Sequence, residues 1–235
     1  MRLFVSQLLS LPCRQRLGEL GFDMTLLPPF SLLPQPVASH ADMLFFDLGG
    51  SVLMHRAYFE ENASLFRGVS LTLSEEPIMP QYPHDILFNA LKIDSAVYGL
   101  ENHLSLHIRS SFTIRNVKQG YAKCSVCALG SEAFITSDPS MARVLERDGK
   151  SVLNIQSGHI SLPGYDNGFI GGASFVFDHT LYTFGSLAHH PDGKAMTAFA
   201  IKHGFTVCPL SDEPLLDVGG ALPLHDSLQN ERSLL

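Results

Sequence analysis

The sequence contains an internal repeat with a shift of 48 residues. Residues 123–138 (KCSVCALGSEAFITSD) align with residues 171–186 (GGASFVFDHTLYTFGS), and each segment is typical of a strand, a tight turn and a second strand. Each is followed by a predicted helix that ends at a glycine, and then by a third strand, over 151–155 or 205–209. Because an internal repeat determines the architecture of a whole chain, the other segments are interpreted against this unit.

The predicted helices of the repeat carry start and stop signals. Ser137 or Asp138 is the expected N-cap of the first helix, with a proline at its first position, and Asp192 is the expected N-cap of the second. Gly149 and Gly204 follow the two helices. These signals place a helix between the second and third strands of each unit.

Two further units fit the same pattern. Residues 40–54 are a predicted hairpin with its turn at Gly49 and Gly50, and residues 82–98 are a second hairpin with its turn near Asp94. The N-terminal segment has a strand over 3–6, a helix over 12–20 and a strand over 24–27, but no first strand. A C-terminal strand within 215–224 can supply it and close a ring, which leaves no unpaired sheet edge.

The expected architecture is therefore a single α/β domain of five strand-strand-helix-strand units around a pseudo-fivefold axis. The predicted units are residues 214–235 plus 1–36, 37–80, 81–116, 117–162 and 163–213.

This arrangement resembles the pentein fold. That fold is shared by guanidino-group-modifying enzymes, among them dimethylarginine dimethylaminohydrolase, arginine and agmatine deiminases and amidinotransferases, and by the ribosome anti-association initiation factor. In the enzymes a Gly-Gly-Asp opens a strand, and a C-terminal glycine run precedes a nucleophilic cysteine. Gly171-Gly172 and Val218-Gly219-Gly220 match these motifs in part. The resemblance implies a five-bladed α/β propeller with a central channel.

Both motifs depart from the enzymes at their chemical positions. Ala173 stands where the aspartate is expected, and no cysteine follows Cys208. The chain also resembles an uncharacterised bacterial family assigned to this fold, through 120–125 (GYAKCS), 162–165 (LPGY), 190–192 (HPD) and 216–220 (LDVGG). The usual activity of the fold therefore cannot be transferred directly.

Polar residues at the expected starts of the first strands are the candidate site. We expect these strands to line the channel and bring together His40, Asp42, His84, Asp85, Asn89, Lys123, Cys124 and Asp217, with Tyr165 as a cover. The hypothesis is that Cys124 is a nucleophile activated by Lys123, with His40 or His84 as the base. Asp42, Asp85, Asn89, Lys123, Tyr165 and Asp217 would then bind the substrate.

Each candidate also has a structural interpretation. Cys124 can be an unreactive core residue, since cysteine is among the most buried residue types. His84 and Asp85 follow a proline and suit a strand-entry turn, and Lys123 can pair with Asp42 or Asp217. The sequence therefore leaves two functions open: a cysteine-dependent hydrolase or transferase acting on a guanidino- or amide-bearing molecule, and a non-catalytic binding module for a small ligand or protein partner.

Composition excludes several other classes. The net charge of −7 with 16 Lys and Arg residues argues against nucleic-acid binding, and no apolar run reaches the roughly 18 residues that span a bilayer. Four cysteines are too few for a secreted disulfide scaffold, and the N-terminus lacks a cleavage motif, so a cytoplasmic location is expected. No metal or cofactor is expected: side chains three apart on a strand, such as Cys124 and Cys127, face opposite ways, and His189 and His190 precede a helix start.

Overall fold

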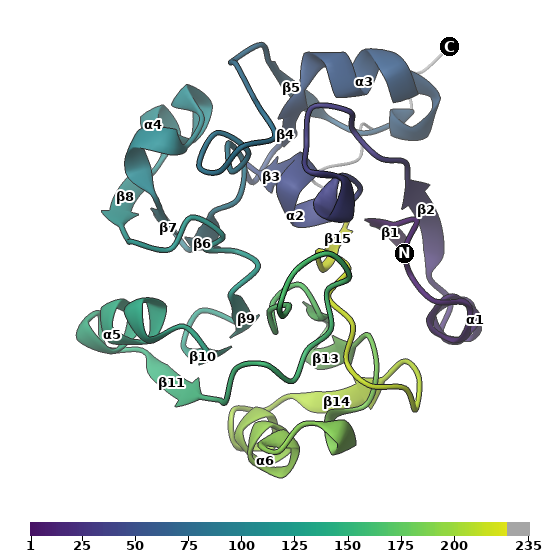
Figure 1. Cartoon of the computed structure of the whole chain (residues 1–235), viewed down its shortest axis with the longest axis vertical. Coiled ribbons are helices and arrows are strands. Elements are labelled where there is room, and N and C mark those ends of the chain that lie inside the picture. The colour runs from purple at the N-terminus through teal and green to yellow at the C-terminus, as the bar shows by residue number, and fades with distance from the viewer. Residues whose placement is uncertain (225–235) are drawn as a thin grey trace.

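The computed structural model describes residues 1–224, so the part of the predicted first unit that covers 225–235 lies outside it. The described residues form five three-stranded sheets arranged in a ring around a central axis (Figure 1). The sheets, in chain order, are β15 (Ala221–Pro223), β1 (Arg2–Ser6) and β2 (Asp23–Leu27); β3 (Phe45–Asp47), β4 (Val52–His55) and β5 (Leu71–Ser74); β6 (Leu91–Ile93), β7 (Ala96–Gly99) and β8 (Thr113–Asn116); β9 (Val126–Leu129), β10 (Ala133–Thr136) and β11 (Ser151–Asn154); and β12 (Ser174–Phe177), β13 (Thr180–Thr183) and β14 (Thr206–Pro209).

Every sheet has the same connectivity. The middle strand pairs antiparallel with the inner strand and parallel with the outer strand. A helix connects each parallel pair, because parallel neighbours need a crossover. These helices are α1 (Leu11–Glu19), α3 (Arg56–Asn62), α4 (Leu106–Ser111), α5 (Pro139–Arg147) and α6 (Gly193–Lys202). The predicted strand-strand-helix-strand unit is thus confirmed five times.

The C-terminal strand closes the ring as the sequence predicts. β15 pairs antiparallel with β1, with Leu3 opposite Pro223 and Val5 opposite Ala221. The N-terminal unit therefore receives its missing inner strand from the other end of the described chain, and this pairing joins residues more than 200 positions apart in sequence. The two ends of the repeat series become one unit.

The structure shows which of the predicted N-cap residues make capping hydrogen bonds. The Asp138 carboxylate accepts hydrogen bonds from the backbone N–H groups of Ser140 and Met141, so Asp138 and not Ser137 is the side-chain cap of α5. Asp192 occupies the N-cap position of α6 but makes no capping bond there. Its carboxylate instead accepts the backbone N–H of Gln156 at 2.7 Å.

Two polar segments expected at strand starts have other conformations. Ala41–Leu44 forms a short helix, α2, in which the His40 carbonyl accepts the N–H groups of Met43 and Leu44. Residues 84–90 form successive turns before β6 begins at Leu91. In the first segment the Asp42 N–H donates to the Gly219 carbonyl, so this helix is bonded to a neighbouring unit.

No helix within residues 1–224 has both the length and the apolar content needed to cross a lipid bilayer.

Candidate functional site

Two cavities lie near the axis, and they share no lining residue. We call the larger one, of about 390 Å³, the Asp42 cavity, and the smaller one, of about 250 Å³, the thiol cavity. Inner-strand residues of all five units line the Asp42 cavity, so it is the predicted central channel. The segments that precede the inner strands line the thiol cavity, whose walls are Val37, His40, Met43, Tyr121, Cys124, Leu162, Tyr165, Asp166, Asn167, Phe169 and Asp217.

The thiol of Cys124 lies in the turn just before β9. Its residue is 5 % exposed, and the Asn89 side-chain amide donates a hydrogen bond to Sγ at 2.9 Å. Burial raises the pKa of the Cys124 thiol well above its usual value, and the carboxylates of Asp42 and Asp217 raise it further. The thiol is therefore neutral at neutral pH, and a positive charge bound among these carboxylates would favour its ionisation.

Asp217 is a buried carboxylate held by backbone donors. Its Oδ2 accepts the N–H of Phe169 and its Oδ1 accepts the N–H of Gly219, both at 2.9 Å. Burial raises the pKa of Asp217 to about 7, and the Asp42 carboxylate adds to the rise. Gly172 makes room for this side chain, since a Cβ at that position would lie 2.0 Å from Asp217 Oδ1. The second glycine of the Gly171-Gly172 pair is thus part of the site's construction.

His40 lies beside Asp217 with one nitrogen available. Its Nδ1 is 3.8 Å from Asp217 Oδ1, while its buried Nε2 has no hydrogen-bond partner within residues 1–224. Burial lowers the pKa of His40, although the Asp42 carboxylate acts in the opposite direction. Gly219, at φ +77°, permits this packing because a Cβ there would lie 2.2 Å from His40 Cβ. A neutral imidazole in this position can accept a proton at Nε2.

Asn89 has a different setting from the one predicted. It lines neither cavity, and both ends of its amide are bound within the protein. Its Nδ2 contacts the carbonyl oxygen of Asp42 and two sulfur atoms, and its Oδ1 accepts the N–H groups of Lys123 and Cys124. The contacts of Asn89 therefore connect three units and orient the thiol.

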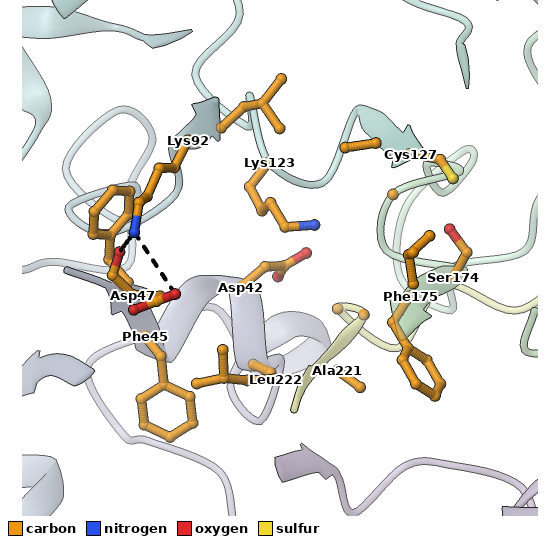
Figure 2. Close-up of a pocket in the computed structure, with 18 of the residues that line it drawn as sticks. Asp42, Phe45, Asp47, Lys92, Lys123, Cys127, Ser174, Phe175, Ala221 and Leu222 are labelled. Atoms are coloured by element: carbon orange, nitrogen blue, oxygen red, sulfur yellow. Dashed lines mark hydrogen bonds and ion pairs between the residues drawn. The ribbon is translucent and has the colours of Figure 1, made fainter. Parts of the chain in front are cut away.

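Asp42 and Lys123 face the other cavity (Figure 2). Asp42 is 6 % exposed, and both of its carboxylate oxygens are buried without a hydrogen-bond partner among the described residues. The Lys123 side chain points toward this carboxylate in Figure 2. Lys92 on the same wall instead donates to the Asp47 carbonyl at 3.0 Å and lies 3.7 Å from its carboxylate. Lys123 is thus positioned toward Asp42 and not within the thiol cavity.

Of the remaining predicted site residues, Tyr165 lines the thiol cavity, whereas His84 and Asp85 line neither cavity. His84 is exposed, packs its ring against His103 and lines neither cavity. Asp85 is fully buried, and its Oδ2 accepts the hydroxyl of Tyr121 at 2.7 Å. Burial raises the pKa of the Asp85 carboxyl, and the Tyr121 hydrogen bond opposes the rise. Tyr165 lines the thiol cavity and is 43 % exposed, as a residue at its mouth would be.

Sequence reasoning missed Tyr121 and Phe169 as cavity walls. Both precede inner strands by a few residues, at corresponding places in the two aligned units: the 48-residue shift pairs Tyr121 with Phe169. Extending the alignment by two residues toward the N-terminus would have found them. Cys127, in β9, lines the Asp42 cavity while Cys124 lines the thiol cavity, and no group of three or more potential metal ligands occurs within residues 1–224.

The sequence matches one family of known proteins. Residues 4–222 match the family described as "Family of unknown function (DUF6873)". The chain belongs to this family. No curated protein matches the sequence.

Solved structures with the same fold show what this DUF6873 chain is similar to. An amidinotransferase of the saxitoxin biosynthetic pathway from Microseira wollei superposes with a TM-score of 0.56 at 10% identity, over 94% of this chain and 79% of that one. DDAH from Pseudomonas aeruginosa, in complex with citrulline, gives 0.52 at 10% identity over 90% and 92%. Agmatine deiminase from C. jejuni gives 0.51 at 8% identity over 89% and 75%. The predicted pentein fold is confirmed.

The structure shows the surroundings of the two positions at which the sequence departs from the guanidino-modifying enzymes. Ala173, at the position of the enzymes' aspartate in the resemblance, is fully buried among apolar side chains that include Ile170 and Leu187. Asp217 is the buried carboxylate beside the Gly171-Gly172 pair. The thiol nearest to it in the cavity wall comes from the β9 unit, not from the C-terminal strand.

Proposed function

We propose that this protein is a cysteine-dependent hydrolase or transferase that acts on a small cationic molecule with a guanidino or amide group. The observation that carries the proposal is the composition of one wall: the Cys124 thiol, the His40 imidazole with its unpartnered Nε2, and the Asp217 carboxylate all line the thiol cavity. A nucleophile, a base and a group that attracts a cation are what attack on a guanidinium carbon requires.

The electrostatics suggest how the substrate would activate the thiol. Two carboxylates, Asp42 and Asp217, oppose ionisation of Cys124 while the cavity is empty. A guanidinium bound at Asp217 offsets their charge, so the thiol proton can pass to His40 Nε2.

The resulting thiolate forms a bond to the guanidinium carbon, and the electron pair of the C–N bond leaves with the amine, which takes the proton from His40. The covalent intermediate is a thiouronium from a guanidino group or a thioester from an amide. Attack of water on its carbon breaks the C–S bond and restores the thiol, which completes hydrolysis, and attack of an amine would instead complete a transfer. The fold similarity to an amidinotransferase and an agmatine deiminase supports a substrate of this chemical class.

The test measures thiol reactivity in the folded protein. Iodoacetamide labelling followed by peptide mapping, with and without agmatine, is expected to modify Cys124 more slowly when agmatine is present, because the bound molecule occupies the thiol cavity and its carbon takes the thiolate. Cys13, which is also buried but lies in α1, is the internal control and its rate should not respond to agmatine. Assays for released ammonia or amine with guanidino compounds should detect turnover in the wild type and none in Cys124→Ser. Equal labelling of both cysteines with no turnover would refute the proposal.

A non-catalytic binding module is the second candidate, because one observation favours it. The Cys124 thiol is 5 % exposed, receives a hydrogen bond from Asn89 and has a strongly raised pKa, as a structural cysteine would. In that case a guanidino ligand raises the melting temperature of wild type and Cys124→Ser equally. Ligand binding without product in either protein would identify this function.

A further inference from the structure

We infer that the Asp42 cavity is a second ligand site, which binds a small zwitterion of the α-amino acid class between Asp42 and Lys123. The inference does not depend on the proposed function, because this cavity contains no part of the proposed catalytic group and shares no wall residue with the thiol cavity. Its volume of about 390 Å³ falls in the range of roughly 300–1,000 Å³ that is usual for small-molecule sites.

The Asp42 carboxylate is the first argument. A buried ionised carboxylate without hydrogen bonds is costly, and native proteins rarely keep one. Asp42 is 6 % exposed, its two oxygens have no partner among the described residues, and it lies in the cavity wall. The Cys124 thiol interacts with this carboxylate from the other cavity, but no N–H group of the described residues donates to it. A ligand ammonium, with three N–H donors, can supply the missing hydrogen bonds.

Lys123 is the second argument. It extends from the segment before β9 toward Asp42 in Figure 2 and forms no ion pair within 4.0 Å among residues 1–224. Lys92, the other lysine in the wall, is already engaged by Asp47 and by the ring of Phe112. The cavity therefore presents one acid and one base, Asp42 and Lys123, and neither forms an ion pair within 4.0 Å among the described residues.

The rest of the wall suits a compact ligand with an apolar part. Phe45, Phe175 and Leu222 line the cavity from three different units. Gly171, Gly219 and Gly220 contribute backbone without side chains. A ligand with an ammonium at Asp42, a carboxylate at Lys123 and an apolar side chain against the apolar part of the wall satisfies all three parts of this surface. A simple amine or a simple carboxylic acid satisfies only one of the two charges.

A ligand bound in the Asp42 cavity would change the ionisation of the Cys124 thiol in the thiol cavity. The Asp42 carboxylate is one of the groups that raises the pKa of Cys124. An ammonium bound at Asp42 offsets that charge, so an occupied Asp42 cavity is expected to make the Cys124 thiol more reactive. The second site would thereby act as an activating site for the first.

The experiment is calorimetric titration of the protein with each standard L-amino acid in turn. For the tightest binder, the matched amine without the carboxylate and the matched acid without the ammonium are titrated as well. We expect at least one amino acid to bind and both analogues to bind at least about tenfold more weakly, since each loses a charge-assisted contact. Failure of every amino acid to bind, or equal binding of either analogue, would overturn the inference.

Matched variants locate the site. Asp42→Asn and Lys123→Met should each weaken binding at least about tenfold, whereas Asp47→Asn and Lys92→Met, on the same wall but already paired, should change it less than about threefold. Lys123→Gln is the second variant if Lys123→Met does not fold by circular dichroism. Equal losses in the four variants would overturn the assignment. Titration of Cys124→Ser separates the two proposals, because amino acid binding should persist there whether or not the chain is a cysteine-dependent enzyme.

Discussion

The Asp42 carboxylate acts to raise the pKa of three neighbouring groups, His40, Cys124 and Asp217. The backbone of Asp42 is fixed at both ends, by the N–H bond to Gly219 and by the carbonyl that accepts from Asn89. No N–H group of the described residues donates to its carboxylate, which interacts with the Cys124 thiol. Substitution of this carboxylate by an amide therefore changes charge and little else. Such a position allows electrostatic effects to be measured without a large loss of packing.

The first prediction concerns the thiol. Asp42→Asn removes a negative charge that raises the pKa of Cys124, so a larger thiolate fraction is expected at any given pH. The rate of Cys124 alkylation between pH 7 and 9 should rise several-fold, and its pH profile should move to lower pH. Asp47→Asn is the control, since Asp47 is not among the charges that act on Cys124. An unchanged profile in Asp42→Asn would contradict the electrostatic argument.

The second prediction follows from the pKa of Asp217. Its value of about 7 in the folded protein exceeds the usual 3.8, so the folded state binds more protons than the unfolded state between these values. Stability from this group is therefore lost as pH rises from about 4 to about 7.

Urea unfolding at pH 5 and pH 8, for wild type and Asp217→Asn, tests this. The variant loses part of the carboxylate's hydrogen bonding at both pH values. The difference in unfolding free energy should nevertheless shift toward the variant by more than about 1 kcal/mol at pH 8, because only the wild type must ionise a buried group. A difference independent of pH would show that the pKa of Asp217 is not raised.

At the scale of elements, the start of α5 shows how one cap is chosen from two candidates. Asp138 accepts two backbone N–H bonds of the first turn and also the side-chain amide of Gln119 at 2.7 Å. Asp138→Ala should lower the free energy of unfolding by about 1–2 kcal/mol, through loss of the cap. Ser137→Ala, the adjacent candidate, should cost less than about 0.5 kcal/mol. Equal effects in urea denaturation would mean that the cap is shared.

Elements with local signals were predictable, and those set by neighbouring units were not. The turn at Asp94 and the proline at the start of α5 follow from residue types within a few positions, and the closing strand within 215–224 follows from the strand that the N-terminal repeat unit lacks. The short helix Ala41–Leu44 does not, because the bond from Asp42 to Gly219 comes from the far end of the chain. The same limit applies to the site.

Strand starts indicated His40, Cys124 and Asp217 as polar groups near the axis, and all three line the thiol cavity. They did not show that adjacent residues face different cavities, as Lys123 and Cys124 do. Nor did they distinguish exposed His84 from buried Asp85, since neighbouring positions in a turn do not follow the two-residue alternation of a strand. Side-chain direction in these turns depends on contacts between units, which local sequence does not contain.

At the scale of the whole molecule, hydrogen bonds join the five units in a closed circuit around the axis. Asn89 donates to the Asp42 carbonyl, and the Lys123 N–H donates to Asn89. Gly172 N–H donates to the Cys124 carbonyl, Val218 N–H to the Gly172 carbonyl, and Asp42 N–H to the Gly219 carbonyl. Two of these junctions depend on a side chain, and in both it is the side chain of Asn89. The circuit also connects both cavities, because its members supply wall residues to each.

A substitution of the Asn89 side chain can therefore remove hydrogen bonds that join neighbouring units. Asn89→Leu keeps a similar volume but leaves the Lys123 N–H and the Asp42 carbonyl unpaired in a buried region. It should lower the free energy of unfolding by about 2–4 kcal/mol and, because the amide also orients Sγ, change the alkylation rate of Cys124.

Asn62→Leu is the matched control, since its amide donates within α3, to the Tyr58 carbonyl at 3.0 Å. It should cost less than about 1 kcal/mol and leave Cys124 unaffected. Urea denaturation and thiol labelling of both variants would decide whether closure of the ring depends on Asn89. If Asn89→Leu proved no more destabilising than Asn62→Leu, the remaining backbone junctions would be sufficient to hold the five units around the two cavities.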